Sequence, residues 1–200
     1  MSDYRTLRRV LPGALVTLVL ALGACSADTG SAPAEPAAAS PSADRPYTVV
    51  SAPSLAPGDD IPAPTDAVVL TVDGVSDAPV ELDMATLESM GLVEYAADDK
   101  QALGRTATFR GVLLSTLLDT VGAEDATNLR TTAVNDYSVE IPAADAEELP
   151  VLLATSVDGE RMDIESYGPL RVVYPTEGVE LDATVYDPRW IWQLTDITVE

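Results

Sequence analysis

The sequence contains no histidine, and this absence excludes several kinds of chemistry. Histidine is the commonest general base in enzymes and the commonest protein ligand of transition metals. A serine–histidine–aspartate triad therefore cannot form, and no serine has the context of a nucleophile elbow. Carboxylates are abundant, but no pair among the 33 acidic residues stands out as the acid and base of a glycosidase.

Basic residues are scarce. Lysine and arginine number 11 against 33 aspartates and glutamates, which gives a formal net charge of −22 at pH 7. Proteins bind nucleic acids and anionic headgroups by neutralising phosphates with lysine and arginine. Nucleic acid is therefore not expected as a partner.

The chain has a single cysteine, Cys25. It follows three arginines, an apolar run at Val10–Leu22 and small residues, which is the pattern of a secretory signal and too short for an ordinary membrane span. The phrase LGAC at residues 22–25 resembles the lipobox of bacterial lipoproteins, which implies cleavage after residue 24 and a lipid on the sulfur of Cys25. The alternative is a plain signal peptide that leaves Cys25 as a free thiol.

A lipidated Cys25 predicts a location as well as a modification. The protein would be anchored by lipid in the cell membrane, on its extracytoplasmic side, with membrane lipid as its first partner. Arg8 and Arg9 leave twin-arginine export open, although Leu7 precedes them in place of serine or threonine. Lipidation would also remove the one thiol, so no disulfide, zinc–thiolate site or cysteine nucleophile is expected.

The chain divides into three parts: a signal peptide at 1–24, a lipidated cysteine with its linker at 25–65, and one domain at 66–200. Eight of the fifteen prolines fall in the linker, together with alanine and serine, so we expect a disordered tether. Tyr47–Val50 interrupts the linker with strand-forming residues. This segment either docks on the domain as a short strand or is an apolar point in the tether.

Predicted strands outnumber predicted helices in the domain, which gives a β-rich α+β fold. Asp83 can cap a helix that ends before Gly91, and a leucine-rich helix at Leu113–Val121 ends at the following glycine. The apolar positions of the last strand, Trp190–Val199, change parity near Thr195, which indicates a bulge. Further strands are predicted at 68–72, 80–82, 92–97, 106–109, 129–134, 137–141, 151–157 and 170–174, with a helical turn at 143–148 and a polar loop at 98–105.

Five phrases of the domain occur in a familiar order: LTVDGVSDAPVELDMATLESM, FRGVLLSTLLDTVGA, AVNDYSVEIP, GPLRVVYP and WIWQLTDITV. Together they make residues 68–200 resemble the oxidoreductase molybdopterin-binding domain family, which has the sulfite-oxidase-like fold. The likeness is greatest to its small, stand-alone, exported members. The resemblance implies a molybdopterin cofactor whose molybdenum is bound by a cysteine thiolate just after the strand at 92–97.

The sequence departs from that family pattern at the expected metal ligand. The corresponding loop, Asp98-Asp99-Lys100-Gln101, contains no sulfur, and the usual lysine–tryptophan pair near the C-terminus is replaced by Ile191-Trp192. We therefore expect no resident cofactor and a non-catalytic module that binds a ligand or a partner. The alternative is a molybdopterin-dependent oxidoreductase in which an oxygen of Asp98, Asp99 or a serine replaces the thiolate. Whether the protein is an enzyme stays open.

Arg171, in GPLRVVYP, is the family's arginine that this chain retains. A guanidinium suits phosphate or carboxylate, so Arg171 could orient a small anionic ligand. With acids far in excess, an internal ion pair is the more expected arrangement. A membrane or envelope protein is the other candidate partner. Aromatic residues that would line the pocket, or else pack in the sheet, are Tyr137, Tyr174, Trp190 and Trp192.

Four acidic residues near the expected site are Asp98, Asp99, Glu177 and Glu180. Their oxygens suit a hard cation such as Ca²⁺, but their spacing matches no EF-hand loop. A solvated acidic rim is the more expected arrangement, so we predict no metal site.

Overall fold

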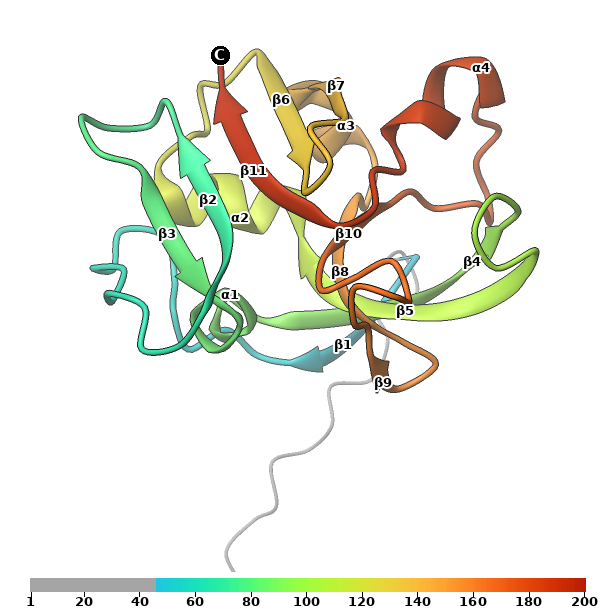
Figure 1. Ribbon diagram of the computed structural model, residues 1–200, viewed down its shortest axis with the longest axis horizontal. Helices are drawn as coiled ribbons and strands as arrows, with labels where there is room; N and C mark the ends of the chain where they lie inside the picture. Colours follow the sequence, from blue (N-terminus) through green and yellow to red (C-terminus); the bar gives the residue numbers. More distant parts are fainter. Residues whose placement is uncertain (1–45) are drawn as a thin grey trace, which may run out of the picture. The chain divides into compact units, whose positions relative to one another are not determined.

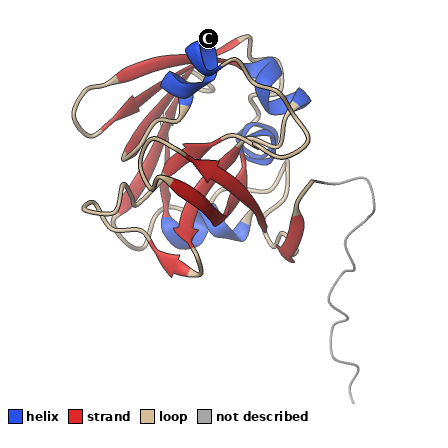
Figure 2. Ribbon diagram, turned by 90° about the vertical axis from the view of Figure 1, so that its right-hand side faces the viewer, coloured by secondary structure: helices blue, strands red, loops and turns tan. Residues whose placement is uncertain are grey.

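The computed structural model of this protein describes residues 46–200. The predicted signal peptide, Cys25 and the first part of the linker lie outside the described residues. Strands outnumber helices, which confirms the predicted α+β class (Figure 2). None of the helices in residues 46–200 has the length and apolar character that a membrane-spanning helix needs.

Two sheets form the described domain (Figure 1). The strands of the first sheet are all antiparallel and follow the order β1-β4-β5-β8-β10, with the short β9 also paired to β8. They are β1 (Thr48–Ser51), β4 (Leu92–Asp99), β5 (Arg105–Leu113), β8 (Leu152–Val157), β9 (Glu160–Arg161) and β10 (Arg171–Val173).

The second sheet has the order β3-β2-β11-β6-β7. Its last strand in the sequence, β11, lies between β2 and β6, and the β11–β2 pairing is parallel while the others are antiparallel. This arrangement places the C-terminal strand in the middle of the sheet. The strands are β2 (Val68–Asp73), β3 (Val80–Asp83), β6 (Asn128–Ala133), β7 (Ser138–Pro142) and β11 (Leu194–Val199).

The helices are short and connect the strands. Two were predicted with their caps. The Asp83 side chain accepts a hydrogen bond from the Thr86 amide at the start of α1, and Gly122 ends α2 with a φ of 78°. The helices are α1 (Met84–Ser89), α2 (Leu114–Val121), α3 (Ala143–Glu148), α4 (Ala183–Tyr186) and the 3₁₀ turn η1 (Asp187–Arg189).

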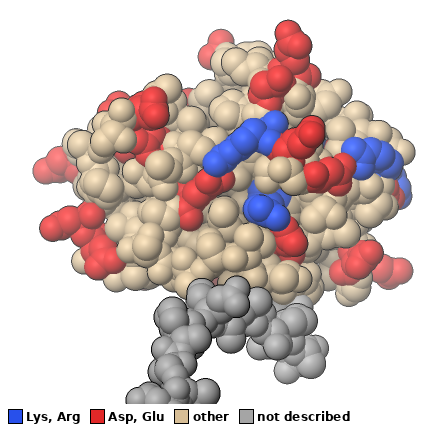
Figure 3. All heavy atoms as spheres, turned by 90° about the horizontal axis from the view of Figure 1, so that it is seen from below, with Lys and Arg blue, Asp and Glu red and all other residues tan. Residues whose placement is uncertain are grey.

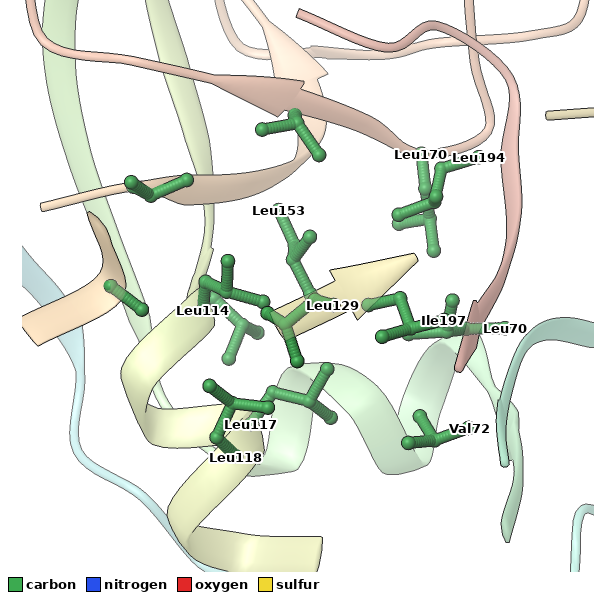
Figure 4. Close-up of a cluster of buried hydrophobic side chains, with 14 of the residues drawn as sticks. Leu70, Val72, Leu114, Leu117, Leu118, Leu129, Leu153, Leu170, Leu194 and Ile197 are labelled. Atoms are coloured by element: carbon green, nitrogen blue, oxygen red, sulfur yellow. The ribbon is translucent and has the colours of Figure 1, made fainter. Parts of the chain in front are cut away.

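One large apolar core lies between the sheets and α2 (Figure 4). The inward leucines of α2, at positions 114, 117 and 118, pack there with Leu70 and Val72 of β2 and with Leu194 and Ile197 of β11. A second cluster, which includes Phe109 and Tyr95, packs along β4, β5 and β8. Burial of this extent stabilises a domain by about 25 cal/mol for each Å² of apolar surface removed from water.

The segment at Tyr47–Val50 docks on the domain. Thr48–Ser51 forms β1 and pairs with β4, and beyond it the amides of Ser54 and Leu55 donate to the carbonyl of Ser89. Leu55 is buried, and the Thr65 amide donates to Asp83. The part of the linker from residue 46 onward therefore lies against the domain.

Two predicted boundaries are corrected by the structure. Asp98 and Asp99 belong to β4 and pair with Thr106 and Arg105, so the loop begins only at residue 100. The last strand begins at Leu194 instead of residue 190, while its register shift at Thr195 confirms the predicted bulge. The sequence reading also missed α4 and η1.

Acidic side chains are spread over the face of the domain that Figure 3 shows, with basic side chains lying among them. Each of the seven basic residues described lies within 4.0 Å of a carboxylate. Arg161, for example, makes two hydrogen bonds of 2.6 Å to Glu88. The described part of the surface therefore has no basic patch, and its cations are already paired.

Candidate functional site

Asp99 and Arg171 form a buried ion pair between the end of β4 and the start of β10. Arg171 Nη1 lies 2.9 Å from Asp99 Oδ2, and each side chain is only 1% exposed. The other carboxylate oxygen, Oδ1, accepts a hydrogen bond of 2.9 Å from the amide of Ala102. Arg171 therefore forms the internal ion pair that the sequence favoured, and Asp99 is its partner.

Four aromatic rings surround the Arg171 guanidinium. Within the described residues, the Nε and Nη2 groups of Arg171 donate to no acceptor, and neither does the Trp192 indole nitrogen. Ring faces attract a cation, so the rings stabilise the buried guanidinium charge. The distances from Arg171 Cζ to the ring centroids are 5.2 Å for Phe109, 5.7 Å for Trp190, 5.8 Å for Trp192 and 6.0 Å for Tyr167.

The Arg171 environment acts on its ionisation in two opposite ways. Burial lowers the pKa of the guanidinium below its usual range, and the charge of Asp99 raises it again. Arginine stays protonated in proteins because its intrinsic pKa is so high. The pair is therefore a neutral unit, in which each charge compensates the burial of the other.

A pocket of about 460 Å³ lies beside this ion pair. One wall is the end of β4 with the turn that follows it, and the opposite wall is the chain from Pro175 through α4 to Trp190. In Figure 1, α4 lies on the same side of the domain as the β4–β5 turn. A volume of 300–1,000 Å³ is typical of small-molecule sites.

The charged residues that line the pocket are mostly acidic. They are Asp98, Asp99, Glu180 and Asp187, against Lys100 alone. Lys100 lies 3.6 Å from Asp98 and is 82% exposed, so it is weakly held. A cleft lined by one sign of charge concentrates ions of the opposite sign.

Hydrogen bonds join the two walls of the pocket. The Asp98 amide donates to Thr176 Oγ1 at 2.8 Å, and Gln101 Nε2 donates to the carbonyl of Asp187 at 3.2 Å. The pocket is thus fixed by contacts within the chain, as preformed ligand sites usually are.

Asp145 in α3 anchors the wall that carries α4. Its Oδ2 accepts hydrogen bonds from Arg189 Nη1 at 2.7 Å and from the Tyr174 hydroxyl at 2.8 Å. Burial, and then the bond to Asp145, raise the pKa of Tyr174 far above its usual range, so its hydroxyl stays a donor. Tyr186 packs against both donors, with its ring centroid 5.3 Å from that of Tyr174 and 5.0 Å from Arg189 Cζ.

The predicted site residues separate into two groups. Arg171, Asp99, Trp190 and Trp192 lie together, and Asp98 lies in the pocket beside them. The other two aromatics lie elsewhere. Tyr174 is buried in the main core, and Tyr137 is 46% exposed with its hydroxyl donating to the carbonyl of Pro188.

The acidic residues considered for a hard cation also separate. Asp98, Asp99 and Glu180 line the pocket, whereas Glu177 lines a smaller one beside β1. No three carboxylates among residues 46–200 lie close enough to hold a metal ion.

Sequence reasoning missed four residues of this region. Phe109 contacts Arg171 from the distant strand β5, and Tyr167 contacts it from only four positions earlier in the sequence. Tyr186 and Asp187 belong to the helices that were not predicted. One signal was available for α4: Asp182 precedes Ala-Thr-Val-Tyr and caps it by accepting from the Thr184 amide.

Comparisons with known proteins agree on the fold. The family described as the oxidoreductase molybdopterin binding domain matches residues 59–180. Among solved structures, the crystal structure of the sulfane dehydrogenase SoxCD from Paracoccus pantotrophus is similar, with a TM-score of 0.50 and 17% identity over 65% of this chain and 37% of that chain. At that identity the likeness shows the fold alone. The curated proteins contain no match. The family match covers more than half of this chain, and the chain therefore belongs to the oxidoreductase molybdopterin binding domain family.

Proposed function

We propose that this protein is a lipid-anchored binding protein on the extracytoplasmic side of the cell membrane, without molybdenum redox chemistry. It keeps the family fold and uses the pocket beside Asp99 for a ligand or a partner. The observation that carries this proposal is the commitment of every described cation to a carboxylate, including the retained family arginine, Arg171.

Molybdopterin is the cofactor that the family name implies, and the residues of the pocket do not fit it. Soft thiolate or imidazole donors are absent from residues 46–200, because the chain has no histidine and its cysteine is Cys25. A phosphate group needs arginine or lysine donors, whereas the pocket presents four carboxylates and the exposed Lys100. Arg171 could turn to a phosphate only by leaving Asp99 as a buried, unpaired charge.

Metal and pterin analysis tests this proposal directly. The full chain is purified from membranes of cells that synthesise the cofactor, and molybdenum and oxidised-pterin fluorescence are measured per mole of protein. We expect neither in stoichiometric amount. Stoichiometric molybdenum with pterin would overturn the proposal and support an oxidoreductase with an oxygen ligand, for which Asp98 is more accessible than the buried Asp99.

The membrane anchor is a separate part of the proposal. It is supported by the LGAC phrase at residues 22–25 and by the proline-rich segment that follows. Two acyl chains bind a membrane stably, whereas one is marginal. Labelling with radioactive palmitate should mark the wild type and leave Cys25→Ser unlabelled. Wild-type protein that is unlabelled and found in the soluble fraction would refute the anchor.

A further inference from the structure

The pocket beside Asp99 has a charge that selects among ligands. Its four carboxylates and one ammonium leave a formal charge of −3, or −2 when Arg171 behind Asp99 is included. Glu180 and Asp187 make no ion pair with any residue in the described part of the chain. Their charges are therefore available to a ligand.

Two aromatic residues, Tyr186 and Trp190, also line the pocket, and both are half-buried. An aromatic face binds ammonium and guanidinium groups with about 0.5–2 kcal/mol, more as the site excludes water. Both rings already lie close to a guanidinium group of the protein. The Trp190 ring centroid is 5.7 Å from Arg171 Cζ, and the Tyr186 ring centroid is 5.0 Å from Arg189 Cζ. The lining therefore combines carboxylates with ring faces.

Asp99 supplies a third observation. It lines the pocket and is only 1% exposed, and its Oδ2 accepts no hydrogen bond from the described residues although Arg171 lies 2.9 Å away. The Arg171 guanidinium compensates the charge of this oxygen, which is closed to the pocket, so the carboxylates that a ligand can reach are those of Asp98, Glu180 and Asp187.

The arrangement of the acids argues against an inorganic ion. No three of them lie close enough together to ligate one metal. Carboxylates that are spread around a pocket of about 460 Å³ suit instead a molecule whose positive charge is carried on a carbon framework.

We propose that this pocket binds a small organic cation, an amine or quaternary ammonium compound, between the free carboxylates of Glu180 and Asp187 and the rings of Tyr186 and Trp190. The inference rests on the proposed function, because molybdopterin would occupy the same pocket.

Choline and agmatine are suitable probes, and 3,3-dimethyl-1-butanol is the neutral isostere of choline. Each is titrated by calorimetry at low ionic strength into the full chain in an uncharged maltoside detergent, with the fluorescence of Trp190 and Trp192 recorded in parallel. We expect saturable binding of at least one cation, no binding of the neutral isostere, and a change in tryptophan fluorescence on binding. Added salt should weaken the binding.

A double variant tests the location. Glu180→Gln with Asp187→Asn removes two charges without changing shape and should weaken cation binding about tenfold, as expected for about 1.4 kcal/mol. Glu124→Gln with Asp125→Asn makes the same change in net charge outside the pocket and should leave the affinity unchanged. Equal losses in the two double variants would overturn the proposed location.

The remaining outcomes separate this inference from the proposed function. Protein that is free of molybdenum and pterin but binds neither cation, or binds the neutral isostere equally well, overturns this inference alone. Protein that carries stoichiometric cofactor overturns the proposed function and this inference with it.

Discussion

The Asp99 carboxylate lies 2.9 Å from the Arg171 guanidinium, and neither side chain reaches solvent. The two residues come from β4 and β10 and are 72 positions apart in the sequence. The pair lies beside the pocket, and Arg171 is part of the interior of the domain.

The first prediction concerns this pair. Asp99→Asn or Arg171→Met should each lower the free energy of unfolding by about 3–5 kcal/mol, because each leaves one buried charge without a partner. The double variant should lose less than the sum, since it leaves no unpaired charge. Urea denaturation at pH 7 measures all three.

An exposed ion pair provides the control. Glu140 lies 3.8 Å from Arg130, and both side chains are more than half exposed. Glu140→Gln should change the free energy of unfolding by no more than about 0.5 kcal/mol. Additive losses in the Asp99 and Arg171 variants would contradict the coupling between them.

Local sequence signals explain which parts of the fold were predictable. The ends of α1 and α2 depend on Asp83 and Gly122, each within a few residues of the helix that it caps. The bulge at Thr195 was visible as a change of parity within one strand. Each of these features is set by neighbours in the sequence.

The site was less predictable because its contacts are distant in sequence. Asp99 is a strand residue because it pairs with Arg105, and a run of polar residues there reads as a loop. Arg171 was correctly expected to pair with an acid, but none of the many acids could be singled out. Residues 190–193 lie outside the last strand, and Gln193 among them adopts a φ of 54°, which no local pattern indicated.

The second prediction concerns acid stability through Asp83. Its carboxylate accepts hydrogen bonds from the Thr86, Thr65 and Asp66 amides, and these hold the pKa of Asp83 well below its usual range. The stabilisation is complete above the unfolded-state pKa of about 4 and is lost as pH falls toward the lower folded-state pKa. The free-energy advantage of the wild type over Asp83→Asn should therefore be greatest between about pH 5 and pH 7 and should shrink below about pH 4.

The Asp83→Asn variant keeps one side-chain oxygen that can accept from the Thr86 amide, but its NH2 group replaces the oxygen that accepts from Thr65 and Asp66. It therefore removes the charge together with those acceptor contacts, and the pH dependence of the difference reports the charge. Asp77→Asn is the matched control, because Asp77 is exposed and makes no side-chain hydrogen bond in the described residues. Urea denaturation across the pH range compares the three proteins. A constant difference between wild type and Asp83→Asn down to about pH 2 would rule out the mechanism.

The third prediction concerns the pocket wall anchored by Asp145. Arg189→Met removes the ion pair of 2.7 Å between Arg189 and Asp145, which is largely buried. Amide exchange in Ala183–Trp190 should become about tenfold faster, since a hydrogen bond to a charged group contributes about 1.5–3 kcal/mol. Exchange in β4 and β5 should not change.

Arg161→Met is the control for that experiment, because it removes an arginine–glutamate pair on β9 and α1 without touching the wall. Hydrogen exchange followed by mass spectrometry resolves the segments concerned. If both variants loosened residues 183–190 equally, Asp145 would not be the anchor.

The fourth prediction concerns the close approach of β5 and β8 at Gly111. A β-carbon added to Gly111 would overlap the carbonyl oxygen of Leu153 and lie 2.7 Å from the Cα of Ala154, so two backbones would have to separate. Overpacking of this kind costs about 1–3 kcal/mol, and a clash with backbone is at the upper end. Gly111→Ala should therefore lower the free energy of unfolding by about 3 kcal/mol.

Gly104→Ala provides the comparison, because Gly104 has a φ of 65° and no atom lies within 4 Å of the added carbon. This variant should lower the free energy of unfolding by only about 1 kcal/mol. Thermal and urea denaturation rank the two variants, and a larger loss at Gly104 would show that backbone conformation, not the contact between β5 and β8, limits these positions.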